Sequence, residues 1–181
     1  SLGNIILQEV LGATLHNLFP QARGDYPRIH ILGDNADARM LNRYLVQNDL
    51  LPQTTDLYIS SKSGDTIEPL SNAYFFILNW IAGGLTAEEI WQRTVITTND
   101  ESKGNLYEFF KDKPVRIWHI PTRENDVGGR YSVLSLSGLI SAAYTGIDIK
   151  KLLEGARSMY EELENDNYML NRAFKLAVLC F

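Results

Sequence analysis

Several residue types that commit a protein to particular chemistry are scarce in this sequence. It has a single cysteine, Cys180, so neither a disulfide framework nor a thiolate metal site is expected. The three histidines, His16, His30 and His119, do not follow the spacing of a metal-binding motif such as H-E-x-x-H. Each histidine is therefore expected to have a structural or surface role, and no metal site is predicted.

Positive charge and long apolar runs are scarce as well. The chain has a net charge of −5 and a pI near 5.2, with no basic patch that would suit nucleic acid or a membrane surface. The longest apolar run, residues 73–85, is broken by Asn79 and Gly83 and is too short to cross a membrane. The opening residues do not resemble a signal peptide. These absences predict a cytoplasmic protein that binds neither nucleic acid nor membranes.

Composition and hydrophobic pattern predict one globular domain. The chain has 181 residues, of which 45% are hydrophobic and 22% charged, and this suits a single domain spanning residues 1–181. Continuous apolar runs predict four strands, at residues 28–33, 57–60, 94–98 and 115–120. Helical periodicity and a capping-box pattern predict helices at residues 36–48, 67–82 and 104–111 and one beginning at Thr86.

The order of these elements predicts the fold class. Strands that alternate with helices indicate an α/β fold, a three-layer α/β/α arrangement in which helices cover both faces of a parallel sheet. Each strand is too continuous in its apolar content for a sheet edge that faces water. From Ser132 onward the chain has no strand pattern, and we expect two or three helices there, one of them over residues 148–164.

The most informative segment follows the second predicted strand, where residues 61–68 read S-K-S-G-D-T-I-E. The hydroxyl groups of Ser61, Ser63 and Thr66 are hydrogen-bond donors, and Gly64 lets backbone N–H groups turn toward one point. The helix that follows presents its positive N-terminal end. In open parallel sheets, ligands bind outside the carboxyl ends of the strands, where this loop would lie. The segment therefore predicts a phosphate-binding loop.

The kind of phosphate follows from what the loop lacks. It does not have the glycine spacing of a nucleotide P-loop, and no G-x-G-x-x-G dinucleotide fingerprint occurs in the chain, so a monophosphate is favoured. The alternative is an ordinary Ser/Gly connection in which Asp65 or Thr66 caps the next helix.

A second motif follows the last predicted strand. Residues 125–132 read N-D-V-G-G-R-Y-S, and they would reach the same edge of the sheet as the phosphate loop. The two glycines permit close backbone approach, and Arg130 supplies a fixed charge that can meet a developing oxyanion. The alternative is a Gly-Gly turn in which Arg130 pairs with a surface carboxylate.

Together the two motifs resemble one family. The pattern S-K-[ST]-x-x-T-x-E after a strand resembles the phosphate loop of sugar isomerase (SIS) domains, which have a flavodoxin-like fold. The run V-G-G-R-Y-S-V-L-S at residues 127–135, with Gly138-Leu139 after it, is similar to the more specific signature of glucose-6-phosphate isomerases. Residues 33–37 and 143–149 look like further segments of bacterial members, so the resemblance covers nearly the whole chain.

The resemblance implies an activity and a set of site residues. The activity is isomerisation of glucose 6-phosphate to fructose 6-phosphate through a cis-enediol, a step of glycolysis and gluconeogenesis, with no metal or organic cofactor and with a homodimer as the intact enzyme. Arg130 is the catalytic residue implied, because it would stabilise the enediolate. The substrate-binding residues implied are Ser61, Lys62, Ser63, Gly64, Thr66 and Gly129.

The sequence also departs from the family pattern. The family's domain begins with a strand and a Gly-Gly-Ser turn, and residues 1–3 look like those directly after that turn. The family's catalytic glutamate, ring-opening histidine and late lysine match no segment here. We therefore expect a partial SIS domain that lacks its first strand and the second SIS subdomain and is inactive by itself. Glu68 is expected to hold the loop or the helix start rather than to transfer the proton.

Two other functions fit the same resemblance. A non-catalytic SIS module of a regulator would bind a sugar phosphate, but such a regulator should carry a basic helix-turn-helix segment, and none is seen here. An isomerase of the same fold that acts on another sugar phosphate would share both motifs.

Overall fold

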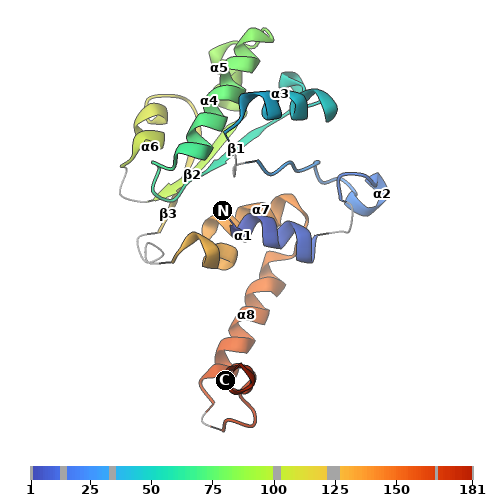
Figure 1. Ribbon diagram of the computed structural model, residues 1–181, viewed down its shortest axis with the longest axis vertical. Helices are drawn as coiled ribbons and strands as arrows, with labels where there is room; N and C mark the ends of the chain where they lie inside the picture. Colours follow the sequence, from blue (N-terminus) through green and yellow to red (C-terminus); the bar gives the residue numbers. More distant parts are fainter. Residues whose placement is uncertain are drawn as a thin grey trace.

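A three-stranded parallel sheet organises the chain. The structure is a computed structural model that describes residues 2–12, 16–32, 36–99, 103–121, 127–165 and 167–180. The strands β1 (Leu57–Ser60), β2 (Thr94–Asn99) and β3 (Arg116–Ile120) lie in the order β1-β2-β3, and both pairs are parallel (Figure 1). Three of the four predicted strands and the parallel sheet are thus confirmed.

The helices between the strands begin and end close to where the sequence predicts. Helix α4 (Ile67–Ala82) follows β1, α5 (Ala87–Gln92) precedes β2, and α6 (Asn105–Phe110) precedes β3. The predicted capping box is present at α5, because the Thr86 hydroxyl accepts the Glu89 N–H at 3.3 Å and the Glu89 carboxylate accepts the Thr86 N–H at 2.8 Å. These two bonds satisfy N–H groups that a helix start otherwise leaves open.

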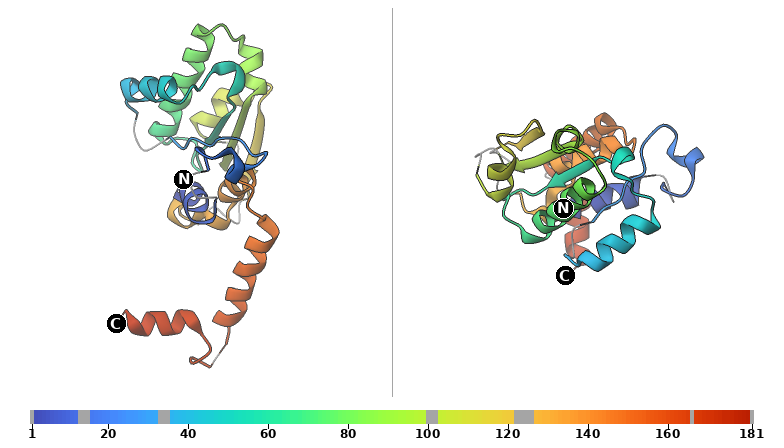
Figure 2. Two further views of the ribbon diagram at one scale, coloured as in Figure 1. Left: turned by 90° about the vertical axis from the view of Figure 1, so that its right-hand side faces the viewer. Right: turned by 90° about the horizontal axis from the view of Figure 1, so that it is seen from above.

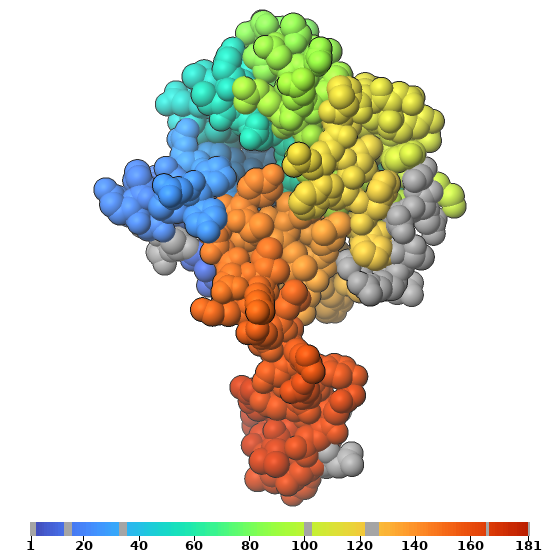
Figure 3. Space-filling model, turned by 180° about the vertical axis from the view of Figure 1, so that it is seen from behind, coloured from blue at the N-terminus to red at the C-terminus, as the bar shows by residue number. Residues whose placement is uncertain are grey.

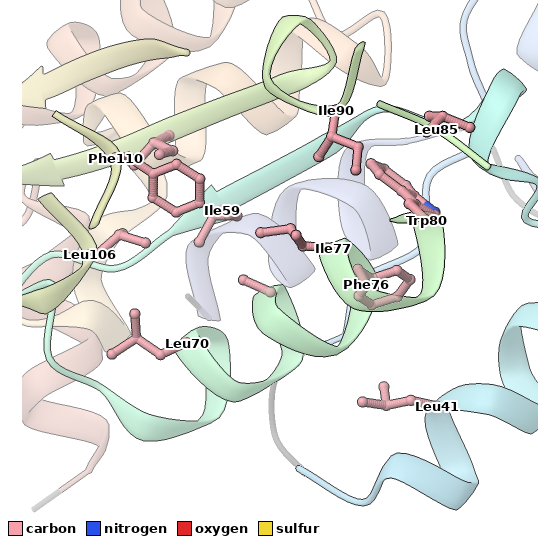
Figure 4. Close-up of a cluster of buried hydrophobic side chains, with 12 residues drawn as sticks. Leu41, Ile59, Leu70, Phe76, Ile77, Trp80, Leu85, Ile90, Leu106 and Phe110 are labelled. Carbon is pink, nitrogen blue, oxygen red and sulfur yellow. The ribbon is translucent and has the colours of Figure 1, made fainter. Parts of the chain in front are cut away.

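The apolar core lies between α4, α5 and α6 and one face of the sheet. Trp80 of α4, Ile90 of α5 and Ile96 of β2 are at most 1% exposed. Figure 4 shows the core from close up, with Trp80 and Ile90 beside each other and with Phe76 and Phe110 in the same cluster. Burying each such side chain stabilises the fold by about 1.5–3 kcal/mol. This layer holds the sheet in place and therefore fixes the end of β1.

Helix α7 (Leu136–Tyr144) packs against the opposite face of the sheet at β1. The Ser60 and Ser137 hydroxyls are 2.9 Å apart, and the Tyr58 hydroxyl donates to the Ser137 carbonyl at 3.5 Å. Helices therefore cover both faces of the sheet, which confirms the predicted three-layer α/β/α arrangement. The layer of α7 also contains α1 (Leu2–Ile6), the π-helical turn Leu7–Leu11 and the 3-10 helix η4 (Gly129–Leu134).

The last two helices form an arm that extends away from this body. Helix α8 (Ile149–Leu163) and helix α9 (Arg172–Leu179) have no buried residue, and Figures 1, 2 and 3 show them projecting from the end of α7. The Asp148 carboxylate caps α8 by accepting the Lys151 N–H at 3.1 Å. The predicted helix over 148–164 and the strand-free C-terminal third are confirmed for the described residues. Among those residues, no helix is long and apolar enough to cross a membrane.

The strand predicted at residues 28–33 is wrong. Residues 28–32 form no strand, and at Ile29 side chains rather than a neighbouring strand bind the backbone. The Ile29 N–H donates to the Asn17 side chain at 2.8 Å, and the Ile29 carbonyl accepts from Asn17 at 2.7 Å and from Gln8 at 3.3 Å. Apolar content alone cannot form a strand when the backbone groups have other partners. The remaining short elements of this region are α2 (Pro20–Arg23), α3 (Ala38–Gln47) and the 3-10 turn Pro52–Thr54.

The expectation that no strand would lie at a sheet edge is also wrong for the described residues. β1 and β3 are the two outer strands, and only β2 lies between neighbours. The outer strands tolerate this position for different reasons. The side chains of Tyr58 and Ser60 contact α7, whereas β3 exposes the charged Arg116 beside the apolar Trp118.

Candidate functional site

The predicted phosphate loop begins where β1 ends, at the carboxyl edge of the sheet. The Ser61 N–H donates to the Thr97 carbonyl at 3.0 Å, and the Lys62 carbonyl accepts the Asn99 N–H at 3.1 Å. These bonds extend the pairing of β1 with β2 into the loop. Ser61 is 5% exposed, and its buried hydroxyl has no hydrogen-bond partner among the described residues. A buried polar group without a partner costs about 1–3 kcal/mol, which a ligand oxygen would relieve.

The other two hydroxyls of the loop lie together at the start of α4. The Ser63 and Thr66 hydroxyl oxygens are 3.4 Å apart, and both residues are exposed. Thr66 is the N-cap residue of α4, and its side chain makes no capping bond to the helix. Ser63 accepts the Asp65 N–H at 3.2 Å. Two exposed hydroxyls therefore lie at the N-terminus of a 16-residue helix whose first N–H groups have no cap from Thr66, an arrangement that suits an anion.

Two glycines in left-handed conformations shape the loop from both sides. Gly64 has a φ of +75° and Gly104 a φ of +91°. The two backbones are so close that a Cβ atom on Gly104 would lie 2.5 Å from the Ser63 carbonyl oxygen. The Leu106 N–H donates to the Gly64 carbonyl at 2.9 Å. Glycine is needed at both positions, because a side chain would be strained and, at Gly104, would clash with backbone.

Asp65 fastens the loop to the next helix. Its carboxylate accepts the Asn105 N–H at 2.8 Å and the Asn105 side-chain amide at 2.9 Å. Asn105 is the first residue of α6. The interpretation in which Asp65 caps its own helix, α4, is therefore wrong: Asp65 binds the start of α6, forty positions along the chain. The loop is thus held by β2 on one side and by α6 on the other.

The arginine motif forms the short 3-10 helix η4 beside α7. Gly128, Gly129, Arg130 and Tyr131 are exposed, Tyr131 to 80%, and a Cβ atom on Gly129 would meet nothing within 4 Å. The Gly129 carbonyl accepts the Ser132 hydroxyl at 2.7 Å. The first two residues of the motif, 125 and 126, lie outside the described residues, as do residues 33–35. The segment leaves open space around Gly129.

Lys62 brings the two motifs together. Its ammonium group donates to the Val127 carbonyl at 2.9 Å, across 65 positions of sequence, and Val127 directly precedes Gly128. Next to them, the Ser60–Ser137 contact joins the end of β1 to the start of α7. The phosphate loop and the arginine motif therefore lie at the same edge of the sheet, as the sequence predicts.

A half-buried tyrosine, Tyr58 of β1, lies beneath this edge. Burial raises the pKa of Tyr58, and its hydrogen bonds with Thr97, Ser60 and Ser137 oppose that rise. A hydroxyl with a raised pKa stays protonated at neutral pH. Tyr58 can therefore act as a donor to the Ser137 carbonyl and help to hold α7 against β1.

The sequence did not indicate three groups that build the site. They are the Gly104 backbone, the Asn105 N–H and the Val127 carbonyl. None of them offers a side-chain pattern in sequence, although a glycine directly before a helical stretch is a weak signal for Gly104. The role expected for Glu68 stays a prediction: this residue is half-buried in the first turn of α4.

Comparisons with known proteins agree on one family. The family model described as phosphoglucose isomerase matches residues 2–180. A glucose-6-phosphate isomerase of Rubrobacter xylanophilus is 36% identical over 91% of this chain, and one of Alkaliphilus metalliredigens is 30% identical over 98%. A crystal structure of a hypothetical protein from Thermus thermophilus superposes with a TM-score of 0.75 and 30% identity over 98% of this chain.

These relatives are longer than the chain. It spans 36% and 38% of the two isomerases and 39% of the solved protein. Because the match to the family model runs through both motifs and almost every described residue, the chain belongs to the phosphoglucose isomerase family.

Proposed function

We propose that this chain is the sugar-phosphate-binding part of a glucose-6-phosphate isomerase, which interconverts glucose 6-phosphate and fructose 6-phosphate through a cis-enediol. The observation that carries the proposal is the Lys62–Val127 bond, because it joins the phosphate loop to the Gly128–Arg130 segment at one edge of the sheet. Membership of the phosphoglucose isomerase family supports the reaction.

The phosphate group of the substrate binds at residues 61–66. The hydroxyls of Ser61, Ser63 and Thr66 donate to its oxygens, together with the first N–H groups of α4. The positive charge of Lys62 lies beside them. Gly64 contributes through its conformation, since its own N–H is bound to the Ser61 carbonyl at 3.2 Å. Such contacts fix the end of the sugar remote from the reaction and so orient the reacting carbons.

The reacting end of the sugar lies beside Gly129 and Arg130. The open space around Gly129 admits the sugar, and the guanidinium of Arg130 offsets the charge that builds on oxygen as the enediolate forms. Proton transfer between C1 and C2 needs a base, which the family resemblance assigns to a glutamate that no segment of this chain matches. The 181 residues alone therefore bind the phosphate without isomerising the sugar.

The setting of the intact enzyme belongs to the same proposal. We place it in the cytoplasm as a homodimer that binds sugar phosphate rather than nucleic acid or membranes. The net charge of −5 supports the exclusion of anionic polymers and surfaces.

Two measurements test the proposal. Calorimetry on the purified chain should detect binding of glucose 6-phosphate and inorganic phosphate, and equal affinity for unphosphorylated glucose would contradict the phosphate site. A coupled assay for fructose 6-phosphate should show turnover by the full-length gene product and none by the 181 residues. Turnover by the chain within about tenfold of the full-length product, after removal of host isomerase, would place the base inside the chain and make Glu68 the first residue to mutate.

A further inference from the structure

Lys62 occupies an unusual position for a residue of a phosphate loop. Its backbone is fixed to β2 through the bond between its carbonyl and the Asn99 N–H at 3.1 Å. Its side chain is half-buried and directs the ammonium group to the Val127 carbonyl at 2.9 Å. A hydrogen bond from a charged donor is shorter and stronger than one between neutral groups. The residue therefore connects the sheet edge to the segment that carries Arg130.

The residues directly after Val127 expose their side chains, although the later part of η4 packs against α1 and α7. Gly128 and Gly129 have no side chain to bury, and Arg130 and Tyr131 are exposed. Its local bonds, from the Tyr131 N–H to the Gly128 carbonyl at 2.9 Å and from Ser132 to Gly129, shape the turn but do not attach it to the phosphate loop. The bond from Lys62 makes that attachment.

We infer that Lys62 is a positioning residue that couples the phosphate loop to Arg130. By holding the Val127 carbonyl, it sets where the Gly128–Arg130 segment lies relative to a bound phosphate. The ammonium group is positively charged and belongs to the phosphate loop, so it attracts a phosphate bound there. A phosphate at the loop then strengthens the orientation of Lys62 and steadies Arg130. This inference rests on the proposed function for its effect on catalysis.

The attachment can be measured without any enzyme activity. Trypsin cuts after Arg130 only when the segment opens, so the rate of that cut, followed by mass spectrometry on the full chain, reports how firmly the segment is held. Lys62→Met should raise the rate about tenfold, equivalent to about 1.4 kcal/mol. Lys62→Arg, which keeps a charged donor, should restore most of the protection. Lys175→Met, which removes an exposed charge from α9, should leave the rate unchanged.

A second trypsin site in the same chain distinguishes local opening of the segment from a general loss of stability. Arg116 is the first residue of β3, and trypsin can cut there only when β3 detaches from β2. The rate of the cut after Arg130 should rise in Lys62→Met relative to the rate of the cut after Arg116. If both rates rise together, or if the rate after Arg130 stays within about twofold of the unaltered chain, Lys62 does not hold the segment.

The coupling is tested by adding inorganic phosphate. Saturating phosphate should slow the cut after Arg130 by about threefold or more in the unaltered chain and in Lys62→Arg, and should leave Lys62→Met unaffected. Phosphate that binds without slowing this cut would overturn the coupling. Failure of phosphate to bind at all would count against the proposed function. The cleavage rates of the variants measured without phosphate would still decide whether Lys62 holds the segment. In the full-length enzyme, Lys62→Met should lower kcat more than it raises KM.

Discussion

The two halves of the site are built in different ways. The phosphate loop at residues 61–66 is bonded to β2 through Ser61 and Lys62 and to α6 through Asp65. The segment at residues 128–131 is exposed, and its glycines have room around them. An anchor that is rigid before the ligand arrives loses little entropy on binding, whereas open space at the reacting end lets the sugar enter. Under the proposed function, anchoring the phosphate and reacting the sugar therefore need loops of different rigidity.

The largest effect on stability is expected when a side chain is added at Gly104, beside the phosphate loop. Gly104→Ala should destabilise the chain by about 2–4 kcal/mol, because alanine is strained at a φ of +91° and its Cβ would lie 2.5 Å from a carbonyl oxygen. Gly129→Ala is the matched control in the open half and should change stability by less than about 0.5 kcal/mol. Urea unfolding followed by circular dichroism measures both. Equal losses in the two variants would show that the halves do not differ.

Arg130 gives the largest expected effect on catalysis. Arg130→Lys in the full-length enzyme should lower kcat by about a hundredfold or more while KM moves little, because lysine cannot reproduce the fixed guanidinium at the developing oxyanion. Steady-state kinetics in both directions check this. A near-normal kcat in this variant would contradict the catalytic role and favour the alternative, in which Arg130 pairs with a surface carboxylate.

Thr66 tests the anchor directly. Thr66→Val removes a hydroxyl and keeps the shape of the side chain, so binding of glucose 6-phosphate should weaken by about 1–3 kcal/mol through loss of a charge-assisted bond. Thr54→Val, in the short turn before β1, is the control and should bind normally. Calorimetry measures both affinities, and an unchanged affinity in Thr66→Val would remove Thr66 from the phosphate site.

The smallest effect is expected at Asp65. Asp65→Asn keeps the oxygen that accepts from Asn105 and removes a negative charge beside the bound dianion, so affinity for phosphate should rise about two- to fivefold at low salt. The gain should shrink as salt is added. Asp56→Asn, just before β1 at the opposite edge of the sheet, should have no effect. A loss of affinity in Asp65→Asn would mean that the carboxylate charge is needed to hold the loop.

The sequence predicts those parts of the site whose signals are local. Helix α4 begins and ends where its hydrophobic pattern and Thr66 indicate, and the loop between β1 and α4 can be located from its hydroxyls and glycine. The strand expected at residues 28–33 failed, and at Ile29 the side chains of Gln8 and Asn17 bind the backbone instead; such partners cannot be read from the apolar run itself. The Lys62–Val127 bond could not be predicted either, because it depends on where a carbonyl 65 positions away lies in the folded chain.

The fastening of the loop by Asp65 has a consequence for the order of folding. The phosphate loop is synthesised before the residues that hold it. Asp65 can bind α6 only after Asn105 has been synthesised, and Lys62 can bind Val127 only later. During synthesis we therefore expect the phosphate loop to take its final form before the arginine segment is docked onto it. A ligand that binds the loop would then stabilise a nascent chain before Arg130 is in place.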